Sequence, residues 1–219
     1  MRTYNTSDTS IRLLLDNLIT SSGSEAYRST FYQIGKKLGE ELRGKINKES
    51  IPVALACTSE DADWLAKGIL DTLNLDVDLC VYWSDRLKFG QDADGNELEY
   101  SNIVKSYEEI DDKSKTLIIT KSIISSSCVV RSQIMRLVSK YKFDKIYIVA
   151  PVMYKDAEPN LRQEFPENIC NLFEFISFAI DNDLNEKTGW VEPGIGGSVY
   201  ERLGVDPRLY YPQIIDSRM

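Results

Sequence analysis

Short apolar runs alternate with helical patterns along most of the chain, and this alternation constrains the fold more than any other feature. The runs have the length of strands and cover residues 52–57, 77–83, 116–119, 145–152 and 172–180. Between them, apolar residues recur every three or four positions, as in amphipathic helices, over 24–46, 64–73 and 129–141. We therefore expect an α/β fold with a mostly parallel central sheet flanked by helices.

Length and charge restrict the function classes. The chain has 219 residues, which suits one domain (1–219) with a core that needs neither disulfides nor a metal. A net charge of −8 argues against a broad nucleic-acid-binding surface. No apolar run reaches the ~18 residues of a membrane span, and no signal peptide is recognisable. We expect a cytoplasmic protein whose partner is neither nucleic acid nor membrane.

The absence of histidine limits the chemistry. With no histidine in the chain, imidazole triads, two-histidine metal sites and histidine-carried phosphate are excluded. The four cysteines form no CxxC pair, so neither a zinc site nor a redox pair is indicated. No residue is assigned as a metal ligand. Acid–base work would fall to Asp, Glu, Lys, Tyr or the substrate itself.

The loop that follows the third strand is a candidate phosphate site. In parallel sheets, ligands bind beyond the carboxyl ends of the strands. Backbone N–H groups at the start of the next helix attract an anion, and three successive serines add hydroxyl donors. The alternative is a serine that merely caps the helix. The candidate residues are Thr120, Lys121, Ser125, Ser126, Ser127 and Cys128.

A glycine-rich turn near the C-terminus is a candidate base site. It reads Pro193-Gly-Ile-Gly-Gly197, and glycine suits a backbone that turns sharply or approaches a ligand closely. The exposed N–H and C=O groups of such a loop can match the donors and acceptors of a planar base. The alternative is a plain surface turn. The candidate base-binding residues are Trp190, Val191, Pro193, Gly194, Ile195 and Gly196.

This turn belongs to a segment that resembles the uracil-binding loop of uracil phosphoribosyltransferases. That family has an Asn-Glu-Lys-Gly-Tyr-Ile-Val-Pro-Gly-Leu-Gly-Asp-Ala-Gly-Asp-Arg run. The matching residues here are Asn185, Glu186, Lys187, Gly189, Pro193, Gly194, Gly196 and Arg202. Trp190 replaces the family's Tyr, Gly197 replaces an Asp, and one residue is inserted before Arg202. The pattern over 24–42 is also similar to the family's first helix.

The resemblance implies a phosphoribosyltransferase-like domain with two appendages. The charged stretch 84–113, which includes Asp94-Gly95, takes the place of the family's hairpin arm, and 181–219 takes that of its base-binding hood. By register, Ser125 to Cys128 hold the 5′-phosphate, with Ser126 and Ser127 at the positions of two family glycines. Thr120, with Lys121 after it, stands where the family has the Asp that holds the ribose.

The segment that would hold pyrophosphate departs further from the family. Residues 56–63 contain no arginine, and Glu60, Asp61 and Asp63 would repel pyrophosphate unless magnesium lay between them. The alternative for these acids is a favourable start of the next helix. Arg86 and Lys88, after the second strand, are the candidates to replace the missing positive charge.

Two functions follow, and both remain open. The first is transfer of phosphoribosyl from phosphoribosyl pyrophosphate to uracil or a related base, with Mg²⁺ as cofactor and no catalytic residue assigned. The second is a catalytically inactive relative that binds a pyrimidine nucleotide as a sensor or regulatory module. A related transferase or hydrolase that acts on another base is a third possibility. The resemblance further implies a homo-oligomer.

Overall fold

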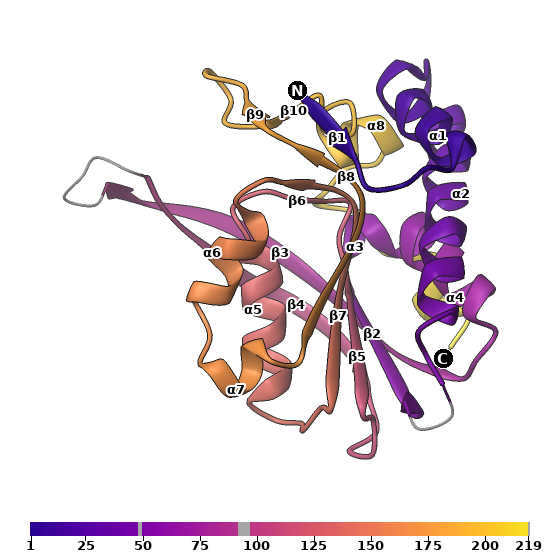
Figure 1. The fold of residues 1–219 in the computed structure, drawn as a ribbon, viewed down its shortest axis with the longest axis vertical. Helices are drawn as coiled ribbons and strands as arrows, with labels where there is room; N and C mark the ends of the chain where they lie inside the picture. Colours follow the sequence, from indigo (N-terminus) through magenta and orange to yellow (C-terminus); the bar gives the residue numbers. More distant parts are fainter. Residues whose placement is uncertain (48–49, 92–96, 219) are drawn as a thin grey trace.

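The computed structural model describes residues 1–47, 50–91 and 97–218, and within them the chain forms a mixed sheet with strand order β1-β8-β7-β5-β2-β3-β4 (Figure 1). The central neighbours β8, β7, β5, β2 and β3 run parallel, whereas β1 and β4 pair antiparallel at the two edges. The predicted α/β fold with a mostly parallel sheet is confirmed. The strands are β1 (Arg2–Tyr4), β2 (Val53–Thr58), β3 (Val77–Gln91), β4 (Glu97–Glu109), β5 (Thr116–Thr120), β7 (Lys145–Tyr154) and β8 (Phe173–Asp181).

The central strands are continuous apolar runs because helices cover both faces of the sheet. All residues of β2 and β5 are buried. One set of alternate residues packs against α1, α2 and α4, and the other packs against α5, α6 and α7 (Figure 1). The helices are α1 (Thr9–Thr20), α2 (Ser24–Arg43), α4 (Lys67–Leu73), α5 (Cys128–Val138), α6 (Ala157–Gln163) and α7 (Glu167–Cys170). None of the helices in the described ranges is long and apolar enough to cross a membrane.

Helix α2 lies unusually close to the helical segment after β2, which consists of α3 (Ser59–Asp61), one π-helical turn η2 (Ala62–Ala66) and α4. A Cβ atom on Gly68 would lie 2.4 Å from the carbonyl oxygen of Tyr32, and one on Gly35 would lie 2.2 Å from that of Leu65. Backbone therefore packs on backbone where the two helices cross, and no side chain fits between them.

Gly68→Ala is expected to destabilise the protein by about 1–3 kcal/mol, because the helices must separate to admit one methyl group. Gly44→Ala is the matched control, since its Cβ would come no closer than 3.4 Å to the atoms around it. Urea unfolding followed by circular dichroism measures both. Equal midpoints for the two variants would contradict the close packing.

Several elements differ from the sequence expectation. Strand β3 continues past Trp83 to Gln91 and pairs antiparallel with β4, from Leu79 opposite Glu109 to Gln91 opposite Glu97. The predicted turn at Asp94-Gly95 lies outside the described residues. The C-terminal segment carries short elements that the sequence pattern did not predict. They are β9 (Asp183–Leu184), β10 (Val191–Glu192), α8 (Val199–Leu203) and α9 (Gln213–Asp216), and β6 (Ile123–Ile124) lies in the loop after β5. Each is too short to show a period and is fixed by its contacts.

Candidate functional site

A pocket of about 280 Å³ lies at the carboxyl edge of the sheet, where the loop after β5 meets the C-terminal segment. One wall comes from Lys121, Ser122 and Ser125, and the opposite wall includes Trp190, Val191 and Ile195. The floor comes from the ends of β2 and the start of α3, including Thr58 and Glu60. The two candidate loops, which are about 70 residues apart in the sequence, thus share one pocket, as the strand-end rule for parallel sheets predicts.

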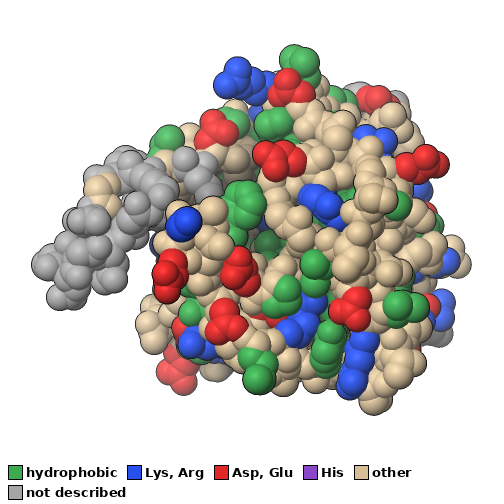
Figure 2. All heavy atoms as spheres, turned by 90° about the horizontal axis from the view of Figure 1, so that it is seen from above, with side chains coloured by type: hydrophobic (Ala, Val, Ile, Leu, Met, Phe, Trp, Pro, Cys, Tyr) green, Lys and Arg blue, Asp and Glu red, His purple; other side chains and the backbone are tan. Residues whose placement is uncertain are grey.

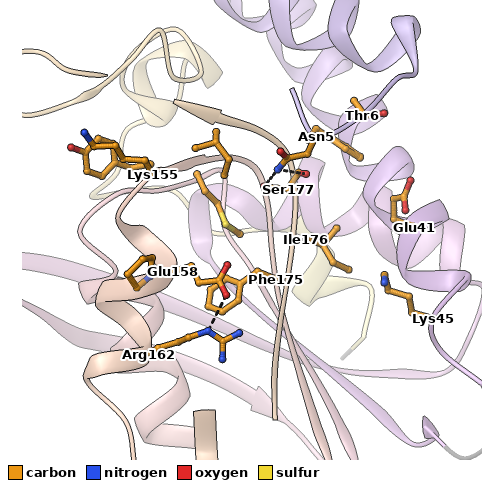
Figure 3. Close-up of a pocket in the computed structure, with 15 residues that line it drawn as sticks. Asn5, Thr6, Glu41, Lys45, Lys155, Glu158, Arg162, Phe175, Ile176 and Ser177 are labelled. Carbon is orange, nitrogen blue, oxygen red and sulfur yellow. Dashed lines mark hydrogen bonds and ion pairs between the residues drawn. The ribbon is translucent and has the colours of Figure 1, made fainter. Parts of the chain in front are cut away.

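A second, larger groove contains none of the candidate residues. It has a volume of about 780 Å³ and runs beside β8 between α2 and α6, with Glu41 and Lys45 on one side and Glu158 and Arg162 on the other (Figure 3). On the molecular face shown in Figure 2, acidic and basic side chains are interspersed and form no broad basic surface.

Lys121 makes the strongest polar contacts in the pocket. Its Nζ atom donates to Glu60 Oε1 at 3.0 Å, to Asp61 Oδ2 at 2.9 Å and to Ser122 Oγ at 2.8 Å. The Lys121 side chain is only 7% exposed and that of Asp61 is fully buried. The ammonium group predicted to meet phosphate is therefore already paired with two carboxylates.

Lys121, Glu60 and Asp61 form a cluster with two carboxyl groups and one ammonium group, and these charges shift the pKa of each member. Burial alone would lower the pKa of Lys121, but the charges of Asp61 and Glu60 raise it. Burial alone would raise the pKa of Glu60, but Lys121 and a hydrogen bond from Tyr200 hold it below its ordinary value. Burial and the neighbouring Glu60 charge raise the pKa of Asp61. The surroundings therefore favour the ionised form of Glu60 more strongly than that of Asp61.

The acids after β2 do not form a magnesium site. Asp61 accepts from Thr58 Oγ1 at 2.6 Å and from the Ser122 N–H at 3.2 Å, in addition to Lys121. Asp63 instead accepts from Tyr210 and from two backbone N–H groups of α9. In the described ranges, no group of three or more Cys, Asp or Glu side chains is arranged to hold a metal ion. The residues present do not fit a protein-held Mg²⁺.

The loop before α5 keeps an unusual backbone where the resembling family has glycine. Ser127 has φ +63°, in the left-handed region, and its hydroxyl donates to the Ala157 carbonyl oxygen at 2.9 Å. It therefore does not cap α5 through its side chain. Ser126 is exposed and its hydroxyl donates to Cys128 Sγ at 3.3 Å, whereas Ser125 lines the pocket. Thr120 is fully buried below the loop.

The glycine-rich turn does not present all of the exposed backbone N–H and C=O groups that the sequence suggested for base binding. Gly194 is buried, its N–H donates to Asp181 Oδ2 at 2.8 Å, and its carbonyl accepts from Arg2 at 2.5 Å. Gly196 packs on α1, where a Cβ would lie 2.7 Å from the Leu18 carbonyl oxygen. Pro193, Gly194 and Gly196 do not line the pocket. The positive φ angles of both glycines serve packing, and the prediction that the N–H and C=O groups of this turn are exposed is corrected for Gly194.

Trp190, Val191 and Ile195 of the candidate base-binding set line the pocket. The Trp190 side chain is 51% exposed, which leaves its ring accessible to a ligand. Tyr200, which sequence reasoning did not select, donates to Glu60 Oε2 at 3.0 Å and contacts Ser59 Oγ at 2.8 Å. Its position in α8, just after the glycine-rich turn, was the available signal. Arg86 and Lys88 lie in β3, but their side chains are outside the described part of the structure.

Comparison with known proteins identifies similar folds. No protein-family model matches the chain, and no curated protein matches its sequence. The solved structure of the AQ2163 protein from Aquifex aeolicus is similar with a TM-score of 0.69 at 14% identity, over 90% of this chain and 95% of that chain. The two chains share a fold over nearly their full lengths.

Solved phosphoribosyltransferases are also among the similar structures. An adenine phosphoribosyl transferase from Trypanosoma brucei, in complex with AMP, pyrophosphate and ribose-5-phosphate, has a TM-score of 0.47 at 10% identity, over 85% of this chain and 77% of that chain. A hypoxanthine phosphoribosyltransferase from Staphylococcus aureus has a TM-score of 0.45 at 12% identity, over 77% of this chain and 90% of that chain. At this level of similarity, neither structure determines the activity or the base of the present chain.

Proposed function

We propose that the protein binds a nucleoside monophosphate in the pocket between the loop after β5 and the C-terminal segment. The observation that carries this proposal is the shared pocket, which joins a serine-lined loop at a helix N-terminus to a half-exposed tryptophan. The phosphate lies at the Ser125 end, where α5 begins. The base stacks on Trp190, and Val191 and Ile195 supply apolar contact.

The charge of the pocket favours a monophosphate over a diphosphorylated donor. Of the described lining residues, Glu60 and Lys121 carry charge, and Lys121 is already matched by Glu60 and Asp61. No unmatched lining cation is left in the described part for a pyrophosphate group. The arrangement therefore supports a binding module. The resemblance of 185–202 to the uracil-binding loop favours uracil or a related base as the base of the ligand.

Trp190→Ala is expected to weaken the binding of uridine monophosphate about tenfold to 100-fold, because stacking of one base on an aromatic ring contributes about 1–3 kcal/mol. Isothermal titration calorimetry measures the Kd of wild type and variant. Leu209→Ala is the control, since Leu209 is 81% exposed and does not line the pocket. Wild-type protein that is folded but binds none of the four common monophosphates would refute the proposal.

Phosphoribosyl transfer to uracil is the second candidate. It is favoured by the resemblance of 185–202 to the uracil-binding loop and by the left-handed Ser127 at the position of a family glycine. The test supplies phosphoribosyl pyrophosphate, Mg²⁺ and uracil together and measures pyrophosphate. Release of pyrophosphate would establish the transferase. Binding of the monophosphate without release of pyrophosphate favours the binding module.

A homo-oligomer remains a proposal, which sedimentation velocity tests.

A further inference from the structure

Glu60 connects the two walls of the pocket. Its Oε1 atom accepts from Lys121, which begins the loop after β5, and its Oε2 atom accepts from Tyr200 of α8 in the C-terminal segment. A carboxylate offers about four acceptor positions, so the hydrogen bonds from Lys121, Tyr200 and the Glu60 backbone do not use all of them. The Glu60 side chain is 15% exposed and lines the pocket.

The surroundings favour the ionised form of Glu60 and leave only 15% of its side chain exposed. Burial alone would raise the pKa of Glu60, but the charge of Lys121, a backbone hydrogen bond and the hydrogen bonds from Lys121 and Tyr200 hold it below its ordinary value. A fixed carboxylate in a site with little water stabilises a nearby developing positive charge much more than it would in bulk water.

The proposed nucleotide pose places a specific part of the ligand beside this carboxylate. If the base lies on Trp190 and the phosphate lies at Ser125, the sugar spans the middle of the pocket, over Glu60. Ser84 also lines the pocket, and its buried Oγ atom has no hydrogen-bond partner among the described residues. A sugar hydroxyl would satisfy it, as a buried hydroxyl requires.

We propose that the pocket hydrolyses the N-glycosidic bond of a nucleoside 5′-monophosphate, with Glu60 as the catalytic residue; this inference rests on the proposed nucleotide binding. The bond between C1′ and the base nitrogen breaks, and its electron pair leaves with the base. Positive charge develops at C1′, next to the carboxylate. Water adds its oxygen to C1′, Glu60 accepts the proton that water loses, and that proton passes to the departing base. The products are the free base and ribose 5-phosphate.

The charges of the pocket favour water, rather than pyrophosphate, as the group that attacks C1′. A reaction with pyrophosphate would bring a highly charged anion to a pocket whose lysine is already paired with two carboxylates. Water needs no additional cation. Tyr200 and Lys121 act on Glu60 rather than on the substrate and are therefore positioning residues.

The test incubates the purified protein with UMP, CMP, AMP and GMP in turn and quantifies free base and ribose 5-phosphate by chromatography. Glu60→Gln is compared with Glu158→Gln, which removes the same charge in the groove beside α6, away from the pocket. Calorimetry on the same samples gives the Kd. Wild type and Glu158→Gln are expected to release base, whereas Glu60→Gln loses at least about 100-fold in rate with its Kd unchanged within about threefold.

Tyr200→Phe provides a second readout. Loss of its hydrogen bond raises the pKa of Glu60, so the acid limb of the pH–rate profile moves to higher pH, and an unmoved limb contradicts the assignment. Wild type that binds a monophosphate but releases no base overturns hydrolysis and leaves the proposed binding intact. No binding at all overturns both. Release by Glu60→Gln at the wild-type rate overturns the role of Glu60.

Discussion

Replacement of Arg2 by alanine is expected to destabilise the protein by about 3–5 kcal/mol, because it leaves the buried Asp181 carboxylate without its cation. Arg2 donates to Asp181 Oδ1 at 2.7 Å and to Oδ2 at 2.8 Å, and it also binds the Gly194 carbonyl. The Arg2 side chain is 6% exposed and that of Asp181 is fully buried. One guanidinium thus ties β1, β8 and the glycine-rich turn together.

The same substitution is expected to loosen the turn that carries Ile195 into the pocket. Hydrogen–deuterium exchange at Gly194 and Ile195 should rise, and thermal or urea unfolding gives the loss of stability. Asp183→Asn is the matched control, because Asp183 pairs with the N-terminal amine at an exposed position and such pairs contribute about 0–1 kcal/mol. Similar losses in both variants would show that the Arg2–Asp181 contact has no special weight.

Lys121→Met is the second substitution with a large expected effect, again about 3–5 kcal/mol near neutral pH. It leaves Glu60 and Asp61 buried with no opposite charge. A control is Lys67→Met, which removes an exposed lysine paired with Asp71. That change should cost less than about 1 kcal/mol.

The loss in Lys121→Met depends on pH in a defined direction. Without the cation, both buried carboxylates have folded-state pKa values above their unfolded values of ~4, so their ionisation opposes folding. The penalty is full at neutral pH and shrinks as the carboxylates protonate. In wild type, the lowered pKa of Glu60 gives the opposite trend, with its contribution to stability lost as pH falls, and the raised pKa of Asp61 offsets part of this trend. The urea midpoints of wild type and Lys121→Met should therefore converge from pH 7 down to pH 4. A constant difference between the two midpoints would contradict the ion-pair assignment.

The central sheet could be predicted from the sequence because its strands are buried on both faces. The apolar runs at 52–57, 116–119 and 145–152 can be recognised without knowing their partner strands, and they correspond to β2, β5 and β7. Strand β1 was not predictable in this way. It has three residues, and its place depends on pairing with 179–181 at the other end of the chain.

The candidate site was also predictable only in part. The meeting of the two loops follows from the strand-end rule, and Trp190 and Ser125 lie in the pocket as the motifs suggest. The partners of Lys121 and of Gly194 did not follow, because Glu60 and Arg2 lie 61 and 192 positions away in the sequence. A motif indicates which groups are present, but only the fold shows which of them are already paired.

The three tryptophans of the chain differ in their surroundings, so intrinsic fluorescence can report ligand binding at the pocket. Trp83 is 9% exposed and stacks on Tyr211, and Trp64 stacks on Tyr210, whereas Trp190 faces solvent at the pocket. Indole emission depends on contact with water. A molecule that enters the pocket therefore changes the fluorescence of one natural fluorophore while the other two provide a steady background, and no dye has to be attached.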